Sequence, residues 1–196
     1  MSLSVRPSIF LCFAGLPLFA ASSVPGIGNF DQVNAGLYRG AQPNDEGFKY
    51  LAKIGVKTVL DLREDGSRSV AEKRAVVAAG MQYVNVPMTG LTAPTVAQMG
   101  TILALLDDAG KGPVFVHCLR GADRTGAVIA AYRIDHDLWD SARALKEAMS
   151  HGMSFFHIPR QQFIRAFQPR TKASESEVAL DGPAVPISGA FAPALQ

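Results

Sequence analysis

A short stretch of the sequence, residues 117–126, contains side chains that are well suited to chemistry on an anion. It reads HCLRGADRTG, and five residues separate Cys118 from Arg124. A cysteine thiolate is a nucleophile, and a guanidinium offers paired N–H donors that match two oxygens of a phosphate group. The spacing therefore predicts that Arg124 holds an oxyanion next to the thiolate of Cys118.

The residues around this pair predict a loop that binds anions through its backbone. Val114–His117 is typical of a strand, Gly121 lets the backbone approach a ligand, and an apolar helix follows from Thr125. A loop between the end of a strand and the start of a helix directs its N–H groups inward, at the positive end of the helix dipole. Such surroundings lower a thiol pKa from about 8.5 to between about 3.5 and 7.5. The alternative is that Cys118 is only a small buried apolar residue.

The whole segment resembles the His-Cys-x5-Arg-Thr/Ser signature of the cysteine-dependent protein tyrosine and dual-specificity phosphatase superfamily. The stretches LYRGAQP and GVKTVLDLR, a proline-containing loop after a third strand and a helical C-terminal part are similar to small bacterial and plant or fungal atypical dual-specificity phosphatases. The resemblance implies that Cys118 attacks phosphorus to form a cysteinyl-phosphate, which water then hydrolyses. It implies no metal and no other cofactor, because Arg124 and the loop amides stabilise the charge on the phosphoryl oxygens. It assigns substrate binding to six loop residues: Leu119, Arg120, Gly121, Ala122, Asp123 and Arg124.

Two neighbours of this loop have supporting roles under the same resemblance. Thr125 donates its hydroxyl to the sulfur of Cys118 and eases the departure of the sulfur in the second step; the alternative is a threonine that only starts the helix. His117 hydrogen-bonds the backbone near Cys118 rather than acting as a base, because a thiolate needs none. Metal binding is not predicted, because no ligand spacing connects His117 with the other histidines, which are His136, His151 and His157.

The general acid is not where the resemblance implies it. Most relatives place an aspartate on a loop after the third strand, but here that loop, Pro87–Pro94, contains no Asp or Glu. We predict Asp123 as the acid, because the charge of a bound phosphate raises the pKa of a neighbouring carboxyl group. The ending Asp-Arg-Thr is also similar to phosphoinositide phosphatases such as the myotubularins. The alternative is that Asp123 pairs with Arg39, Arg63 or a loop amide and only shapes the site.

Three further arginines lie near the predicted site. Arg120 projects from the middle of the loop, where it either favours substrates with more than one phosphate or is simply solvated. Arg39 and Arg63 stand at the ends of strands. We predict that both are structural and hold Asp61 or Asp65, rather than facing the pocket.

The rest of the sequence predicts the architecture that positions such a loop. Short β-branched runs alternate with helix-period segments, and Asn44 and Thr92 are predicted N-caps. We expect an α/β fold in one domain, with a central, mostly parallel sheet of about four or five strands flanked by helices. The predicted strands are Val56–Leu62, Met81–Val86, Val114–His117 and a leading strand at Leu37 and Tyr38, and the last three helices are Thr125–Leu138, Asp140–Ser150 and Pro159–Phe167.

The ends of the chain differ from its centre. Arg6 precedes an apolar run, Ile9–Ala21, which Pro17 interrupts and which is too short to cross a bilayer. Residues 1–22 therefore predict a signal peptide, a protein exported to the periplasm or secreted, and no stable membrane insertion after cleavage. Residues 29–168 predict the phosphatase domain. Residues 169–196, rich in Ala, Pro, Ser and Gly, predict a flexible tail.

The composition excludes several classes of protein. The chain has 196 residues, 48% of them hydrophobic and 18% charged, which is typical of a globular protein. Its formal net charge of +2 gives no general field for nucleic acid, so we predict no nucleic-acid partner. Without residues 1–22, Cys118 is the last cysteine left, so it cannot form an intramolecular disulfide.

Several functions remain open for such a loop. A metal-independent phosphomonoesterase is the leading prediction, with phosphorylated proteins as substrates, on tyrosine or on serine and threonine. Inositol polyphosphates, as in a phytase-like enzyme, or phosphoinositides are the alternative, because of Arg120, Asp123 and the expected export. A rhodanese-like sulfurtransferase lacks this run from glycine to arginine into a helix. An arsenate reductase needs further cysteines, and an inactive phosphate-binding module would not need both Cys118 and Arg124.

Overall fold

The computed structural model describes residues 24–108 and 110–170, and its centre is a five-stranded sheet in the order β1-β2-β5-β3-β4. The strands β2, β5, β3 and β4 are parallel, while β1 pairs antiparallel with β2 at one edge. The carboxyl ends of the parallel strands therefore meet at one edge of the sheet, where ligands bind in open α/β folds. The strands are Asp31–Asn34 (β1), Leu37–Ala41 (β2), Thr58–Asp61 (β3), Gln82–Asn85 (β4) and Val114–Cys118 (β5).

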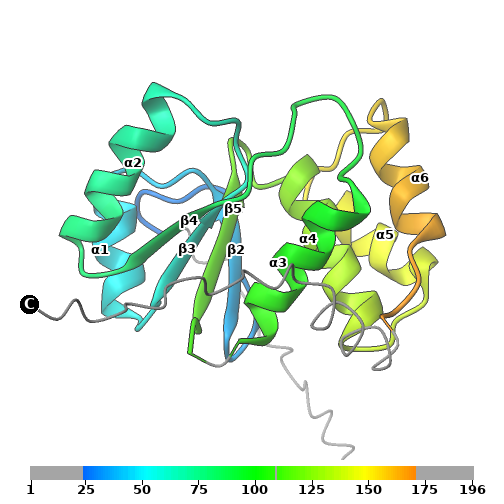
Figure 1. Ribbon diagram of the computed structural model, residues 1–196, viewed down its shortest axis with the longest axis horizontal. Coiled ribbons are helices and arrows are strands. Elements are labelled where there is room, and N and C mark those ends of the chain that lie inside the picture. Colours follow the sequence, from blue (N-terminus) through cyan, green and yellow to red (C-terminus); the bar gives the residue numbers. More distant parts are fainter. Residues whose placement is uncertain (1–23, 109, 171–196) are drawn as a thin grey trace, which may run out of the picture.

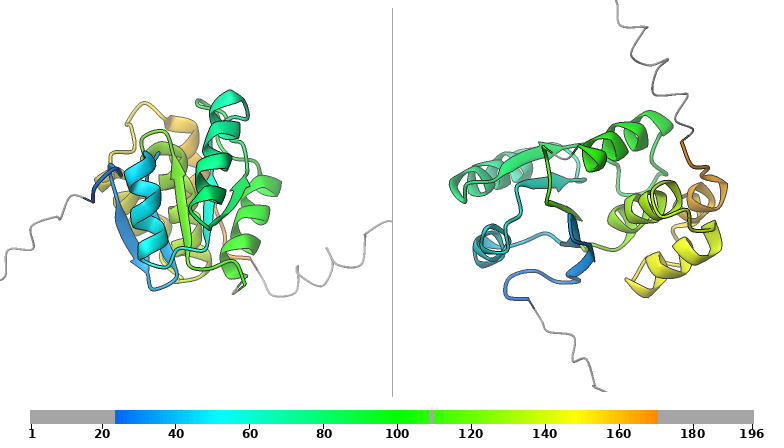
Figure 2. Two further views of the ribbon diagram at one scale, coloured as in Figure 1. Left: turned by 90° about the vertical axis from the view of Figure 1, so that its left-hand side faces the viewer. Right: turned by 90° about the horizontal axis from the view of Figure 1, so that it is seen from below.

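Helices cover both faces of this sheet, α1 and α2 on one face and α3 and α4 on the other, and α5 and α6 pack against the outer side of α4 (Figure 1). Two further views show the same arrangement (Figure 2). The predicted fold class, one α/β domain with a mostly parallel sheet between helices, is confirmed. The helices are Asp45–Lys53 (α1), Ser67–Ala78 (α2), Val96–Asp107 (α3), Asp123–Asp135 (α4), Ser141–Ser150 (α5) and Ile158–Ala166 (α6).

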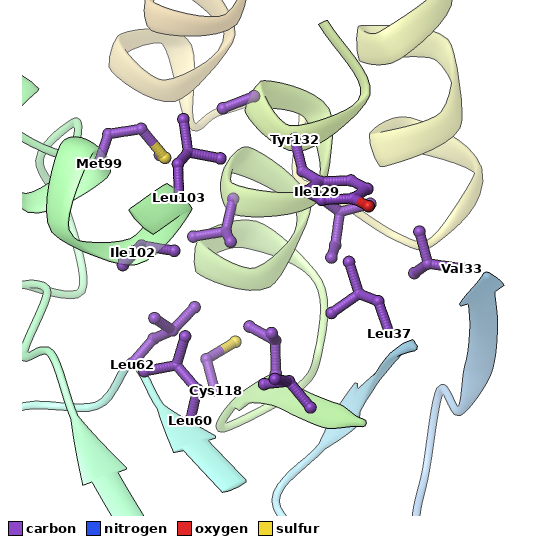
Figure 3. Packing of buried hydrophobic residues seen from close by; sticks show 14 of the residues in the cluster. Val33, Leu37, Leu60, Leu62, Met99, Ile102, Leu103, Cys118, Ile129 and Tyr132 are labelled. Atoms are coloured by element: carbon purple, nitrogen blue, oxygen red, sulfur yellow. The ribbon is translucent and has the colours of Figure 1, made fainter. Parts of the chain in front are cut away.

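Successive residues of β5 point to opposite faces of the sheet, as in any strand. Val116 and Cys118 belong to the apolar core between the sheet and helices α3 and α4 (Figure 3). Phe115 belongs to the second core, under α1 and α2, and the ring of His117 stacks on it with 5.6 Å between the ring centroids. The end of β5 therefore carries a thiol on the α4 side and an imidazole on the α2 side.

The predicted strands and helices are found within a few residues of their expected ends, with two differences. The edge strand β1 carries no strand signal, because its sequence DQVN has one buried residue, Val33. Asn44 caps α1 as expected, but the predicted cap of α3 is wrong. Thr95, not Thr92, accepts the N–H of Gln98 through its hydroxyl, and the Oε1 of Gln98 accepts the N–H of Thr95 in return.

The two ends of the chain are described only in part. The predicted signal peptide, residues 1–22, lies outside the described residues, as does the predicted tail from residue 171 onward. Arg170, near the start of that tail, is anchored: its guanidinium lies 2.5 Å from both Asp107 and Asp135. Of the helices within residues 24–108 and 110–170, none combines the length and the apolar character needed to cross a membrane.

Candidate active site

The predicted anion-binding stretch lies between β5 and α4, at the carboxyl edge of the sheet. β5 ends at Cys118 and α4 begins at Asp123, so four residues separate the strand from the helix. Gly121 adopts a φ of +67°, a left-handed conformation that turns the chain into α4. We call residues 118–124 the phosphate loop.

The amide N–H groups of residues 119–125 are not paired with any backbone carbonyl of the described residues; those of Arg120 and Thr125 are directed at the Cys118 sulfur, and the others can bind a ligand. The first intrahelical bond starts one residue later, from Gly126 to the carbonyl of Ala122 at 2.7 Å. Unpaired amides at the N-terminus of a helix, at the positive end of its dipole, make a site for an oxyanion such as phosphate.

Cys118 lies at the base of the phosphate loop, with 2% of its surface exposed. Burial raises the pKa of its thiol, but the hydroxyl and N–H of Thr125, the charge of Arg124 and the N–H of Arg120 outweigh burial and hold the pKa below its ordinary value. The Oγ1 of Thr125 is itself buried and bonds no oxygen or nitrogen among the described residues, which leaves its proton for the sulfur. The surroundings of Cys118 therefore favour a thiolate.

Replacing Thr125 by valine tests this arrangement. A pKa below the ordinary thiol value means that alkylation of Cys118 by iodoacetamide reaches half of its maximal rate at a correspondingly low pH. Thr125→Val should move this midpoint to higher pH, because the thiolate loses a donor. It should also slow phosphate ester hydrolysis by roughly 10- to 100-fold, the rate equivalent of one hydrogen bond to a charged group. An unchanged midpoint would mean that Thr125 only starts the helix.

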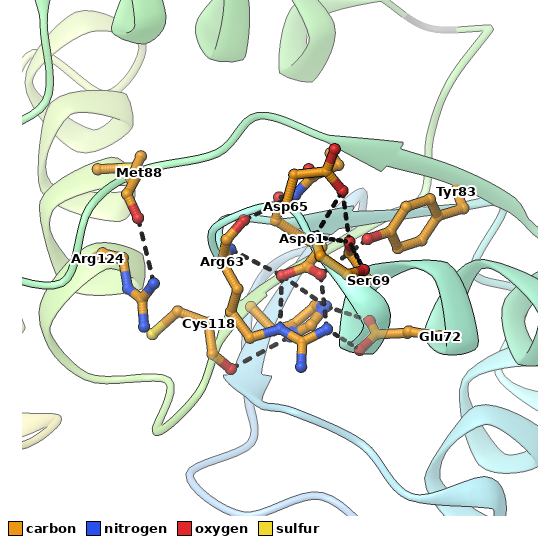
Figure 4. A network of polar contacts seen from close by, with 12 residues as sticks. Asp61, Arg63, Asp65, Ser69, Glu72, Tyr83, Met88, Cys118 and Arg124 are labelled. Atoms are coloured by element: carbon orange, nitrogen blue, oxygen red, sulfur yellow. Dashed lines mark hydrogen bonds and ion pairs between the residues drawn. The ribbon is translucent and has the colours of Figure 1, made fainter.

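The guanidinium of Arg124 is directed toward the sulfur of Cys118 (Figure 4). Arg124 is on the first turn of α4, and its Nη1 donates to the carbonyl of Met88 at 3.2 Å. Met88 belongs to Pro87–Pro94, the loop after β4. Among the described residues, the guanidinium makes no other hydrogen bond. Its remaining N–H groups can therefore bind the oxygens of a substrate.

A second arginine supports the phosphate loop from the sheet. Arg39, on β2, is 1% exposed, and its Nη2 donates to the carbonyl of Gly121 at 2.8 Å. Burial lowers the pKa of Arg39 to about 10, which still leaves the guanidinium charged at neutral pH. The structural position expected for Arg39 is therefore observed, but its partner is a loop carbonyl rather than Asp61 or Asp65.

Gly121 is a position where the backbone of β2 leaves no room for a side chain. A Cβ there would lie 2.3 Å from the carbonyl carbon of Gly40 and 2.5 Å from the N of Ala41. Gly121→Ala should therefore lower the free energy of unfolding, measured in urea, by at least about 2 kcal/mol and remove phosphate binding. The matched control is Gly80→Ala, which has a similar φ of +81° but open space around the new Cβ. It should cost about 1 kcal/mol and leave phosphate binding intact; equal effects of the two variants would contradict the close packing.

Arg120 and Asp123 pair with each other at the rim of the loop. Their side chains approach to 2.5 Å, and 62% of the Arg120 side chain is exposed. The second oxygen of Asp123 accepts the N–H of Ser154 at 2.9 Å and lies 3.6 Å from the Nε2 of His157. Burial raises the pKa of Asp123, but Ser154, Arg120 and His157 together bring it below its ordinary value. In this conformation Asp123 is held as a carboxylate, which does not favour the predicted role as general acid.

The remaining two loop residues contribute backbone rather than functional groups. Leu119 is 51% exposed, and its carbonyl accepts the N–H of Gln42 at 3.3 Å. Ala122, the other of these two loop residues, is buried. Both would contact an anion through their N–H groups.

A buried charged cluster lies on the opposite face of the sheet, behind the phosphate loop (Figure 4). The Nδ1 of His117 lies 3.2 Å from the carbonyl oxygen of Cys118, and its Nε2 lies 2.7 Å from Glu72. Arg63 donates to both oxygens of Asp61, at 2.9 and 2.7 Å, and also contacts Glu72. His117 and Arg63 thus have the kind of neighbours that the sequence predicts for them, while their effect on a reaction stays a prediction.

This cluster has the residue types of a metal site. Asp61, Glu72 and His117 have ligand atoms within 4.8 Å of one another. The guanidinium of Arg63 already contacts both carboxylates, so it supplies the positive charge that a cation would supply. The cluster therefore does not require a metal.

Two residues outside the motif hold the surroundings of the loop. Asn29, before β1, donates to the carbonyls of Arg120 at 3.2 Å and His151 at 2.9 Å. Arg160, on α6, donates to two carbonyls of Pro87–Pro94. Their partners lie up to 122 residues away in the sequence, so no local pattern could have revealed either contact.

Comparison with known protein families shows to which family this chain belongs. The pattern of the family described as DSP-PTPase phosphatase fused to NAD+ kinase matches residues 23–166, well over half of the chain. The chain belongs to this phosphatase family. The resemblance found in the signature at residues 117–126 is thereby confirmed.

Relatives of this family member differ in length and in the function that their names give. The dual specificity protein phosphatase TpbA of Pseudomonas aeruginosa is 34% identical over 137 residues, which cover 69% of this chain and 59% of TpbA. The probable NAD kinase 2 of Oryza sativa is 30% identical over 116 residues, 57% of this chain but 12% of the kinase. The inositol diphosphatase DSP3 of Arabidopsis thaliana is 26% identical over 71% of this chain and 70% of DSP3. The chain thus spans less than two thirds of the first two relatives.

Solved structures share the fold. The core catalytic domain of the PP-IP phosphatase Siw14 from S. cerevisiae has a TM-score of 0.66 at 23% identity, over 80% of this chain and 94% of the domain. TpbA of P. aeruginosa in complex with pTyr has a TM-score of 0.62 at 25% identity, over 79% of this chain and 91% of that one. The α/β fold of this family member is therefore the fold of known phosphatases.

Proposed function

We propose that this protein is a metal-independent phosphomonoesterase that works through a cysteinyl-phosphate on Cys118. The thiolate attacks phosphorus, an S–P bond forms, and the P–O bond to the leaving group breaks as that oxygen takes up a proton. Water then attacks phosphorus, the S–P bond breaks, and inorganic phosphate and the thiolate are released. Arg124 and the loop amides hold the phosphoryl oxygens in both steps. The observation that carries the proposal is the buried thiol with a lowered pKa beneath unpaired amides and beside Arg124.

Hydrolysis of para-nitrophenyl phosphate in the presence of EDTA tests this activity. We expect turnover that EDTA does not reduce, and a phosphoenzyme trapped on Cys118 after acid quenching. A sulfurtransferase would instead transfer sulfur from thiosulfate to cyanide, and an inactive binding module would bind phosphate without turnover. Either result without ester hydrolysis would refute the proposal.

The rim of the phosphate loop favours a phosphorylated protein as the substrate. Phe155 and Phe156, on the segment between α5 and α6, are 77% and 93% exposed, and Leu91 on the loop after β4 is 78% exposed. Hydrogen bonds join both segments to the site. Asp123 accepts the N–H of Ser154, next to Phe155. Arg124 donates to the carbonyl of Met88, in the loop that carries Leu91. Large apolar side chains around a phosphate loop suit the side chains of a peptide better than further phosphate groups. The name of TpbA as a dual specificity protein phosphatase supports this choice.

Inositol polyphosphates are the second candidate. Siw14, a PP-IP phosphatase, has a similar fold, and DSP3 is an inositol diphosphatase. The exposed Arg120 could contact an additional phosphate if it left Asp123. A panel of phosphotyrosine, phosphoserine and phosphothreonine peptides and inositol phosphates, compared by kcat/KM, separates the two. Preference for the inositol phosphates would replace the protein substrate and leave the phosphatase activity in place.

The role of Asp123 is tested with leaving groups of different basicity. Because Ser154 and Arg120 hold Asp123 ionised, we expect Asp123→Asn to change kcat/KM for phenyl phosphate and para-nitrophenyl phosphate by similar factors, within about tenfold. Loss of a general acid would instead slow the poor leaving group, phenol, by about 10²- to 10⁴-fold more and remove the basic limb of its pH profile. That outcome would restore the acid role predicted from the sequence. Arg120→Gln is the control, since it breaks the same ion pair and keeps the carboxyl group.

We also propose that the protein is exported to the periplasm or secreted. The apolar run Ile9–Ala21 after Arg6 supports a signal peptide, which would be removed near Ser22. The mass of the protein recovered from the periplasm or the medium tests this proposal. A full-length protein retained in the cytoplasm would contradict it.

A further inference from the structure

Arg160 is a completely buried charged group near the site that the motif does not include. It lies on α6, is 0% exposed, and its Nε has no hydrogen-bond partner within residues 24–108 and 110–170. No carboxylate of the described chain lies within ion-pair distance of it. A buried guanidinium without a carboxylate costs free energy, so its position has to be stabilised by other contacts.

The contacts of Arg160 are backbone carbonyls of the loop after β4. Its Nη2 donates to Thr89 at 2.7 Å and its Nη1 to Gly90 at 3.0 Å. The preceding carbonyl, that of Met88, accepts from the Nη1 of Arg124. Three consecutive carbonyls of one loop are thus bound by two guanidiniums, one from α4 and one from α6. We call this arrangement the carbonyl clamp.

The same guanidinium also fixes His157. Its Nη1 lies 3.0 Å from the Nδ1 of His157. A guanidinium only donates, so Nδ1 accepts and Nε2 carries a ring proton, which faces Asp123 at 3.6 Å. Arg160 therefore connects the loop after β4 with the segment that holds Asp123 of the phosphate loop.

The charge of Arg160 is directed at the site. Burial lowers the pKa of Arg160, while the negative charges of Asp123 and Cys118 raise it and the nearby Arg124 lowers it. By reciprocity, the guanidinium favours the thiolate of Cys118 and any anion bound above it. Arg160 thus acts on the site through both geometry and charge.

We infer that Arg160 is a positioning residue of the active site, which fixes the loop after β4 and, through the carbonyl of Met88, the orientation of Arg124 toward the bound phosphate. The inference rests on the proposed phosphatase function. It assigns to α6 a part in phosphate binding, in addition to packing against α4 and α5.

The test compares Arg160→Gln and Arg160→Lys with the control Arg165→Gln, an exposed arginine of the same helix. Three quantities are measured in the full chain: kcat/KM for para-nitrophenyl phosphate, the pH midpoint of Cys118 alkylation by iodoacetamide, and the protection of Cys118 by inorganic phosphate. Mass spectrometry of the Cys118 peptide follows the alkylation. Arg160→Gln should lower kcat/KM by roughly 10²-fold, the cost of a small misplacement of a catalytic group. It should also raise the midpoint and weaken the protection by phosphate.

The lysine variant keeps the charge but loses the paired donors, so it should keep the alkylation midpoint near that of the unmodified protein and show an intermediate kcat/KM. Arg165→Gln should behave like the unmodified protein. A folded Arg160→Gln with unchanged midpoint and phosphate protection, or one that only melts at lower temperature, would overturn the inference. If Arg160→Gln does not fold, the test rests on Arg160→Lys. An unchanged kcat/KM together with unchanged protection by phosphate in that variant would then overturn the inference.

The alkylation experiments also separate this inference from the proposed function. If the unmodified protein hydrolyses no ester, the phosphatase proposal fails. The effect of Arg160 on the thiol and on phosphate protection would still be measurable, and its absence would refute the positioning role independently.

Discussion

Replacing Cys118 by serine should reduce the hydrolysis of para-nitrophenyl phosphate to the background rate, a loss of at least about 10⁴-fold. The loop amides, Arg124 and Thr125 favour a thiolate, but a serine hydroxyl has too high a pKa for the same groups to ionise it. The variant should still bind inorganic phosphate, because the donors that hold the oxygens remain.

The measurements are steady-state rates and phosphate binding by calorimetry. Cys12→Ser, made in the full-length chain that keeps residues 1–22, is the matched control, since it removes the other cysteine of the sequence and should leave the rate unchanged. Appreciable turnover by Cys118→Ser would show that the nucleophile is another group, and loss of phosphate binding would show that the variant disturbs the loop itself.

The second large effect is expected for Arg124→Lys. A lysine keeps one positive charge but loses the planar fork that binds two phosphoryl oxygens and the carbonyl of Met88 together. We expect kcat to fall by about 10³- to 10⁵-fold, the range found where an arginine stabilises a phosphoryl-transfer transition state. KM should change much less, because the loop amides continue to bind the ground state.

Arg74→Lys, an exposed position on α2, provides the control for this exchange. It should leave both constants unchanged. Loss of less than about tenfold in Arg124→Lys would mean that charge alone suffices and that the fork has no role in the transition state.

The phosphate loop could be predicted from the sequence because its functional groups are contiguous. Strand, glycine turn and helix start occupy residues 114–126, so the spacing of Cys118 and Arg124 already implies that they face one ligand. The flanking strands and helices could be predicted from the periodicity of apolar residues. The role of Asn44 as the N-cap of α1 could be predicted because its side chain accepts hydrogen bonds from backbone N–H groups. Contiguous patterns of this kind carry their geometry with them.

Features that depend on distant segments could not be predicted in this way. β1 pairs with β2 only through a hairpin, and its four residues show no apolar alternation. The contacts of Asp123 depend on Ser154, 31 residues away, and they favour the shaping role over the predicted acid role. Arg160 looks like an ordinary polar residue of an amphipathic helix, and its burial appears only when α6 packs beside the loop after β4.

The carbonyl clamp has a consequence for how this protein can diversify. Both arginines bind main-chain oxygens of Met88, Thr89 and Gly90, which every amino acid possesses. Thr89 and Gly90 are exposed, so the side chains at these two positions can change during evolution without loosening Arg124, whereas Met88 is buried in the core. A loop held by its backbone leaves its outward groups available for recruiting new substrates, while the catalytic chemistry stays the same.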